Sequence, residues 1–231
     1  MFKSVCLMAL TFAVALPLPA GAGHAEKAWQ NAAPSVVIVE PTWPGYQRPG
    51  FGAPKGTAPE GSGVAVLEPG LIATAAHVVA RATSVTVRDA DGARYKAEIV
   101  AIDEASDLAL LRIEKPVAPL EIAARRPATG AHVCVIGNAF GLGLSLTCGV
   151  VSAGARSGIG FNAVEDFIQT DAAVNPGASG GALVDEEGRL VGLISAIFTK
   201  QSDANTGVNF AVSADLLLIR VKTMLQRTGQ K

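Results

Sequence analysis

The sequence has little net charge and few of the side chains that bind metals. Its 19 Lys and Arg residues nearly balance 20 Asp and Glu residues, which gives a formal net charge of −1 at pH 7. The longest basic run is Arg125–Arg126, so we expect no nucleic-acid partner. The 3 histidines and 3 cysteines are scattered along the chain, and no clustered ligand pattern predicts a metal site.

The chain also lacks an apolar run long enough for an ordinary membrane span. Its N-terminal apolar stretch covers only residues 5–16, after a single lysine, and small residues and prolines follow it. This order is typical of a secretory signal peptide, which we predict over residues 1–25, with cleavage after Ala22 or Ala25. An uncleaved N-terminal anchor is the alternative. The mature chain, residues 26–231, is expected in the periplasm or outside the cell, without stable membrane insertion.

Export permits a disulfide between Cys134 and Cys148, because oxidised cysteines persist outside the cytoplasm. The two residues flank a glycine-rich loop symmetrically, and in a β-hairpin this spacing puts them near opposite positions on the two strands. The alternative is a pair of buried thiols that pack as small apolar side chains. Both interpretations stay open, because strand register cannot be read reliably from sequence.

Short strands dominate the rest of the chain, whose 49% hydrophobic and 17% charged residues are typical of a globular protein. Apolar, β-branched runs alternate with glycine- and proline-rich turns, as in a β-barrel or a β-sandwich. The predicted strands of the first half cover residues 35–40, 61–67, 71–74, 83–88, 94–102 and 108–113. Those of the second half cover residues 131–137, 145–153, 166–170, 182–185, 190–197 and 207–212.

Few other elements are predicted. A helix over about 213–228 closes the chain, because Ser213 is a good N-cap and an apolar side follows it. The remaining segments are a polar lead at 26–30, a surface loop at 41–60, one helical turn at 75–80 and a crossing between the two halves at 115–130.

One serine lies among glycines in the stretch QTDAAVNPGASGGAL, residues 169–183. Ser179 is flanked by Gly177, Gly180 and Gly181, and glycine lets the backbone turn tightly and bring its N–H groups close to a ligand. Ser179 is therefore a candidate nucleophile, and the N–H groups of Gly177 and Ser179 are candidates for an oxyanion hole. Taken alone, a glycine-flanked serine is more typical of an ordinary loop.

A serine nucleophile needs a base for its proton and a carboxylate that orients this base. Two of the histidines, His24 and His132, lie at the signal boundary and at the start of a predicted strand. His77 lies where a predicted strand meets a turn, and Asp107 directly precedes the strand DLALLRI. Each is more often structural when taken alone, but a cleft between the two halves would bring His77 and Asp107 to Ser179.

The motifs TAAHVV, DLALL, IGNAFGLG, QTDAAVNPGASGGAL, VGLISAIF and GVNFAV resemble the HtrA/Deg family of trypsin-like serine proteases. The resemblance extends from about residue 35 to residue 212. It implies an all-β fold of two six-stranded antiparallel β-barrels, over about 34–120 and about 128–212, with the C-terminal helix after them. Residues 26–231 would then form one trypsin-like protease domain.

The resemblance also implies roles for the candidate residues. Ser179 would be the nucleophile, His77 the general base and Asp107 the group that orients it, with Ser195 donating a hydrogen bond to Asp107. The oxyanion hole would consist of the Gly177 and Ser179 N–H groups, with the Ala178 N–H nearby. This chemistry needs no cofactor.

Three features depart from the family pattern. Ala178 stands where the family usually has asparagine, and Ala139 replaces a usual proline. Only the backbone of residue 178 needs to face the oxyanion, so we expect activity to survive. The sequence has no room for a PDZ domain after the helix, which puts peptide-activated regulation and assembly into large cages in doubt. Family members commonly form trimers through the N-terminal segment, where Trp29 could serve, and we consider a homotrimer on this basis.

The resemblance places the primary specificity pocket as well. In trypsin-like folds the residue six positions before the serine lies at the pocket base, here Ala173, with Val174 beside it. The opposite wall is expected from Leu193, Ser195, Ala196 and Ile197. No carboxylate lies in this set, so we predict a preference for small or medium aliphatic side chains before the scissile bond.

The sequence therefore predicts an exported serine endopeptidase that cleaves unfolded or extended polypeptide segments, bound as an added strand along the cleft. Two alternatives stay open. One is a catalytically latent or inactive, chaperone-like binder of unfolded protein. The other is a processing protease of narrow specificity.

Overall fold

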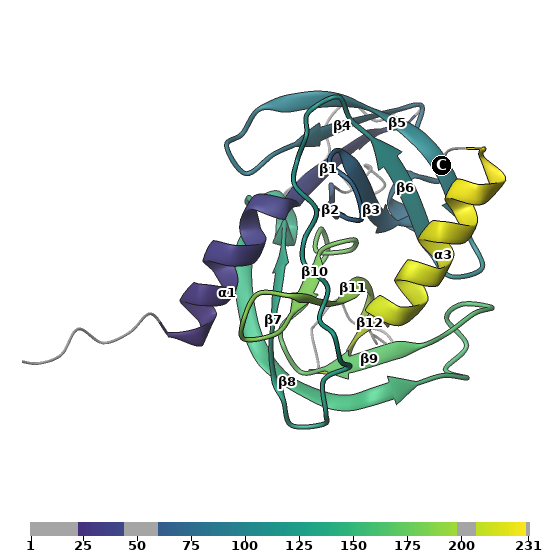
Figure 1. The fold of residues 1–231 in the computed structure, drawn as a ribbon. Coiled ribbons are helices and arrows are strands. Elements are labelled where there is room, and N and C mark those ends of the chain that lie inside the picture. Colours follow the sequence, from purple (N-terminus) through teal and green to yellow (C-terminus); the bar gives the residue numbers. More distant parts are fainter. Residues whose placement is uncertain (1–22, 44–59, 198–206, 230–231) are drawn as a thin grey trace, which may run out of the picture.

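The predicted strands form two closed antiparallel barrels in the computed structural model, which describes residues 23–43, 60–197 and 207–229. The first barrel has the strand order β1-β2-β3-β6-β5-β4 and the second the order β10-β11-β12-β9-β8-β7 (Figure 1). The two six-stranded barrels and the C-terminal helix confirm the predicted fold class.

The strand bounds agree with the predicted runs to within a few residues. The first barrel consists of β1 Val36–Thr42, β2 Gly61–Ala65, β3 Leu71–Ala75, β4 Ser84–Arg88, β5 Arg94–Asp103 and β6 Leu108–Arg112. The second consists of β7 His132–Gly137, β8 Ser145–Arg156, β9 Phe167–Thr170, β10 Ala182–Val184, β11 Leu190–Ile197 and β12 Asn209–Ser213. The helices are α1 His24–Ala32, α2 Ala76–Val79 and α3 Ala214–Arg227, and the 3₁₀ turns are Ala33–Ser35 and Ala139–Gly141.

Strands β3 and β6 are buried on both faces, because they separate two hydrophobic cores. Successive side chains of a strand point to opposite faces. Ile72 and Leu111 accordingly pack inside the first barrel, whereas Leu71 and Leu108 pack in a cluster that also contains Leu193 of the second barrel. This shared core fixes the two barrels against each other, and it lies directly behind the ends of β3 and β6.

The N-terminal segment differs from the sequence expectation. Residues 26–30 are predicted as a polar lead, but they belong to helix α1, which begins at His24. Only Ala28 and Ala32 on α1 are fully buried, with Trp29 partly buried beside them, and so narrow an apolar stripe is hard to recognise in a sequence. Most of the predicted signal peptide, residues 1–22, lies outside the described residues.

Hairpin β7–β8 carries the two cysteines. Cys134 and Cys148 are paired in register across the two strands, and their sulfur atoms form a disulfide bond. The sequence left open whether the two cysteines form a disulfide or remain buried thiols, and in the structure they form the disulfide. Cross-linking of a loop of this size lowers the entropy of the unfolded chain and contributes about 3 kcal/mol to stability.

Helix α3 spans both barrels, as Figure 1 shows. Its N-cap is Ser213, as predicted, and the Ser213 hydroxyl accepts a hydrogen bond from Leu216 N at 3.1 Å. Arg220 of the helix lies 3.5 Å from Asp103 of β5 in the first barrel. None of the helices in the described ranges is both long enough and apolar enough to cross a membrane.

The base of α3 is tied to the segment between the barrels by an ion pair. Arg126 donates to Asp166 and to Asp215, and Ser213 Oγ donates to Asp166 at 2.6 Å. The hydrogen bond from Arg126, with that from Ser213, holds the pKa of Asp166 below its ordinary value despite partial burial. The Asp166 carboxylate therefore stabilises the fold only while it is ionised.

We expect Asp166→Asn to lower the free energy of unfolding by about 1 kcal/mol at pH 7, a value that allows for solvent screening. Because the folded-state pKa of Asp166 is depressed, its contribution is present above the unfolded pKa of about 3.9 and disappears as the pH falls through the folded pKa. Denaturant unfolding of the wild type and the variant between pH 7 and pH 3 measures this. A difference that stays constant down to pH 3 would contradict the prediction.

Candidate active site

His77 and Asp107 meet because β3 and β6 are neighbours. The last register pair of these strands is Ala75 with Leu108, so the residue that precedes β6 lies beside the turn that follows β3. His77 is in that turn, helix α2, and Asp107 directly precedes β6. The His77 Nδ1 atom lies 2.9 Å from Asp107 Oδ2 and 3.0 Å from Oδ1, and the His77 backbone N–H donates to Oδ1 at 3.0 Å.

The carboxylate of Asp107 is held in a fixed orientation. Its backbone has φ +55°, in the left-handed region that non-glycine residues rarely adopt. Ser195 Oγ donates to Asp107 Oδ2 at 2.7 Å, which confirms the hydrogen bond that the resemblance implies. Ser195 lies at a register shift between β11 and β12, between Ile194 and Ala196, and such a shift redirects a side chain.

Burial raises the pKa of Asp107, but hydrogen bonds from His77 and Ser195 and the charge of His77 outweigh this and hold the pKa below its ordinary value. Asp107 is therefore ionised at neutral pH. An ionised Asp107 accepts the Nδ1–H of His77, so the Nε2 atom of the neutral ring is left as the proton acceptor. The His77 side chain is 50% exposed, against 14% for Asp107, so the ring is open to a reactant.

Ser179 lies in the loop between β9 and β10 of the second barrel, pressed against the first barrel. Its carbonyl accepts a hydrogen bond from Ser62 N at 2.8 Å, and the next residue, Gly180, donates to Ile194 O at 2.7 Å. Gly180 has φ +84°, and a Cβ there would overlap Ser62 O and lie 3.1 Å from Ala75 N. Only glycine fits at this position. Because Gly180 lies so close to Ala75, the neighbouring Ser179 lies near the start of helix α2, which carries His77.

The hydroxyl of Ser179 has no hydrogen-bond partner in the part of the chain that the structure describes, and its Oγ is not bonded to His77 Nε2. The bond between a nucleophile and its base is often loose without substrate. The arrangement thus provides an oriented imidazole and, in the adjoining loop, an unengaged hydroxyl.

The backbone before Ser179 forms a tight turn. Gly177 has φ +95°, and a Cβ there would overlap Asn138 O. Pro176 O accepts a hydrogen bond from Phe140 N at 2.7 Å. The peptide bond is trans, so the Gly177 N–H points away from the Pro176 carbonyl. Over the described ranges, neither Gly177 N–H nor Ser179 N–H has an acceptor, as an empty oxyanion hole requires.

The expectation for Ala178 needs a correction. Its N–H was considered as a nearby oxyanion donor, but it donates to Asn175 O at 3.0 Å. This bond closes the turn that precedes the serine, so the Ala178 N–H is engaged within its own loop.

The residues proposed for the specificity pocket do not share one environment. Ala173 is exposed, and its carbonyl accepts a hydrogen bond from Thr147 Oγ1 at 2.6 Å. Val174 and Leu193 are buried in the hydrophobic cores, so their side chains do not line a surface that a substrate could contact. The hydroxyl of Ser195 is directed at Asp107. The side chains of Ala196 and Ile197 lie outside the described part of β11.

Two acidic residues of the second barrel make structural contacts. Asp171 Oδ1 accepts a hydrogen bond from Val150 N at 2.7 Å, and Asp185 pairs with Arg189 across the β10–β11 turn at 2.8 Å. The charge of Asp185 is thus balanced by Arg189, and one carboxylate oxygen of Asp171 is used within the fold.

Sequence reasoning did not single out Ser62 or Asn138, although both contact the loop of Ser179. Ser62 donates to Gly177 O at 2.8 Å, and Asn138 N donates to Ser62 Oγ at 2.9 Å. The only sequence signal at Ser62 is its position between Gly61 and Gly63, which alone indicates a flexible strand entry.

The chain is similar to a family of known proteins. Residues 61–193 match the family model described as trypsin-like peptidase domain. The chain is 40% identical over 161 residues to the periplasmic serine endoprotease DegP of Escherichia coli K12, with 68% of this chain and 34% of the relative covered. It is 42% identical over 171 residues to a probable periplasmic serine protease, do/HhoA-like, of Haemophilus influenzae, with 72% and 36% covered.

A solved structure, that of an HtrA-type protease, AlgW, with a tripeptide, is 37% identical and superposes with a TM-score of 0.77, covering 88% of this chain and 64% of that one. The chain spans about a third of the length of the two curated relatives.

Proposed function

This chain belongs to the HtrA-type trypsin-like serine proteases, and from this premise we propose that it is an exported serine endopeptidase acting on unfolded or extended polypeptides. The observation that carries the proposal is the pairing of His77 with the ionised Asp107, next to a loop that carries the unengaged Ser179 hydroxyl. Relatives named as periplasmic serine endoproteases support export to the periplasm.

In the proposed reaction, Ser179 Oγ attacks the carbonyl carbon of the scissile peptide and its proton passes to His77 Nε2. Asp107 stabilises the imidazolium that forms. The N–H groups of Gly177 and Ser179 donate to the oxyanion of the tetrahedral intermediate. His77 then protonates the leaving amine, and a water molecule activated by His77 hydrolyses the acyl-enzyme.

The proposed substrate preference follows from the absence of charge at the pocket base. Ala173 is six residues before Ser179 and is exposed; Asp185 is paired with Arg189, and Asp171 Oδ1 is bound by Val150 N. A lysine or arginine of the substrate would be buried there without a counter-charge, which is costly. We therefore propose cleavage after small or medium aliphatic residues.

Oligomerisation is part of the same proposal. A homotrimer formed through the N-terminal segment would involve α1, in which Trp29 is only partly buried against the core. Sedimentation velocity of the purified protein measures the assembly directly.

The test is digestion of a reduced, unfolded protein by the purified chain, with Ser179→Ala as the control and mass spectrometry of the products. Cleavage by the wild type alone, after Val, Ala or Ile, is expected. Cuts after Lys or Arg would refute the aliphatic pocket and leave the nucleophile intact. Binding of the unfolded protein without any cleavage would instead favour the chaperone-like alternative. Cleavage at a single site in one dedicated substrate would favour the processing protease.

A further inference from the structure

We propose that Ser62 is a positioning residue for the oxyanion hole, although it lies on β2 of the first barrel, far in sequence from the Ser179 loop. Its hydroxyl joins the backbone of two second-barrel loops, at Gly177 and at Asn138, and so holds the Gly177 N–H in place. The inference rests on the proposed function, because it assigns a role in the same reaction.

Ser62 is fully buried and makes four hydrogen bonds. Its hydroxyl donates to Gly177 O at 2.8 Å and accepts from Asn138 N at 2.9 Å. Its backbone N–H donates to Ser179 O at 2.8 Å, and its carbonyl accepts from Thr74 Oγ1 at 2.7 Å. A single residue thus contacts the backbone on both sides of Ala178, together with a second loop.

These contacts fix the peptide planes around Gly177. The carbonyl of Pro176, on one side, is held by Phe140 N, and the carbonyl of Gly177, on the other side, is held by Ser62 Oγ. Glycine at φ +95° has few steric barriers to a peptide flip. The two hydrogen bonds therefore replace the missing steric constraint. The first holds the peptide that carries the Gly177 N–H, and the second holds the peptide that follows it, so the Gly177 N–H keeps its direction.

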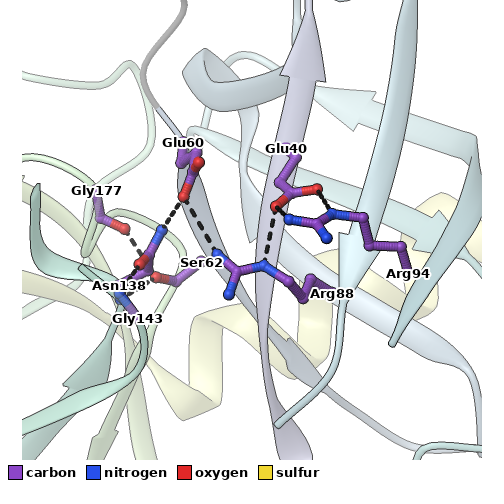
Figure 2. Close-up of polar contacts among 8 residues, drawn as sticks. All are labelled: Glu40, Glu60, Ser62, Arg88, Arg94, Asn138, Gly143 and Gly177. Atoms are coloured by element: carbon purple, nitrogen blue, oxygen red, sulfur yellow. Dashed lines mark hydrogen bonds and ion pairs between the residues drawn. The ribbon is translucent and has the colours of Figure 1, made fainter. Parts of the chain in front are cut away.

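The loop from Asn138 to Gly143 is bound to the first barrel by the same cluster (Figure 2). Asn138 is fully buried; its Nδ2 donates to Glu60 Oε2 at 2.7 Å and its Oδ1 accepts from Gly143 N at 2.8 Å. Glu60 lies 3.6 Å from the guanidinium of Arg88. The first barrel thus holds Asn138 at one end of the turn, and Asn138 in turn holds Gly143 at the other end.

The cluster is closely packed around the Ser62 hydroxyl. A Cβ at Gly137 would lie 3.1 Å from Ser62 Oγ and 3.1 Å from the Ala178 Cα, and one at Gly177 would overlap Asn138 O. Loss of the Ser62 hydroxyl would leave Gly177 O and Asn138 N as buried groups without partners. The backbone at Gly177 is then expected to rotate in search of another donor.

The test compares Ser62→Ala with Ser213→Ala, which also removes a buried hydroxyl that donates once and accepts once but lies at the N-cap of α3. We expect Ser62→Ala to lower kcat about 10- to 100-fold with little change in KM. Complete loss of one oxyanion-hole donor lowers kcat about 100- to 1,000-fold, and this variant keeps the Gly177 N–H but shifts its position. Ser213→Ala should keep the wild-type kcat.

Amide hydrogen exchange gives a second measurement that does not depend on activity. We expect faster exchange in residues 138–143 and 176–181 of Ser62→Ala than in those of Ser213→Ala. If the wild type has no peptidase activity, the proposed function fails, and exchange alone then decides whether Ser62 holds the loop. Wild-type kcat in Ser62→Ala, or unchanged exchange in both segments, overturns the inference.

A second variant covers the case in which Ser62→Ala does not fold. Glu60→Ala keeps the Ser62 hydroxyl and removes the acceptor of the Asn138 amide, together with the ion-pair partner of Arg88. We expect a smaller fall in kcat, about 3- to 10-fold, together with faster exchange in residues 138–143. Wild-type values for both quantities would contradict the role of the cluster.

Discussion

Replacement of Ser179 by alanine is expected to lower kcat by a factor of about 10,000 to 1,000,000, which is the usual fall in kcat when a serine protease loses its nucleophile. Without Oγ no acyl-enzyme can form, and any remaining rate comes from water in the polarised site. The Ser179 hydroxyl makes no hydrogen bond in the described part of the chain, so its removal should leave the melting temperature nearly unchanged. Cleavage of an unfolded protein and thermal unfolding together measure both effects.

The matched control is Ser84→Ala, at an exposed position of β4 in the first barrel. It should keep the wild-type rate and the wild-type melting temperature. Mass spectrometry of the wild type after reaction with a fluorophosphonate should place the label on Ser179. A Ser179→Ala variant that retains more than about a hundredth of the wild-type kcat would rule out Ser179 as the nucleophile.

The second large effect is expected for Asp107→Asn, which should lower kcat about 10,000-fold at neutral pH. The asparagine amide is isosteric but would present an NH₂ group to His77, whereas the carboxylate only accepts. Nδ1 would then have to accept a hydrogen bond, and the proton of the neutral ring would move to Nε2, where the proton of Ser179 must go. The His77 backbone N–H, which donates to Oδ1 at 3.0 Å, keeps the amide oxygen at that place. The Ser195 hydroxyl, which now donates to Oδ2 at 2.7 Å, would then accept from the amide NH₂ instead.

Asp89→Asn is the control for this change. Asp89 Oδ1 accepts backbone hydrogen bonds from Asp91 N and Ala93 N in the β4–β5 turn, and an asparagine oxygen can accept both. We expect full activity for this variant. Because NMR of the histidine ring distinguishes the two tautomers, a His77 in Asp107→Asn that keeps its proton on Nδ1 would refute the mechanism even if activity fell.

Much of the fold could be predicted because its signals are local. Alternation of apolar residues and glycine-rich turns marked the strands, and the capping chemistry of Ser213 marked the start of α3. Local pattern also placed His77 and Asp107 at strand ends and Ser179 in a glycine-rich loop, whereas their roles came from the family resemblance. Helix α1 was missed because two buried alanines, Ala28 and Ala32, form an apolar stripe too weak to distinguish from a polar lead.

The sequence by itself determined the number and order of the strands and the residue types offered at their ends. Only the tertiary structure decided which of these groups are engaged: the Cys134–Cys148 bridge, the use of the Ala178 N–H within its turn, and the contact of Ser62 with Gly177. The physical reason is that backbone preferences act over a few residues. A contact between a strand and a loop that lie 115 residues apart arises only when the two closed barrels have packed together.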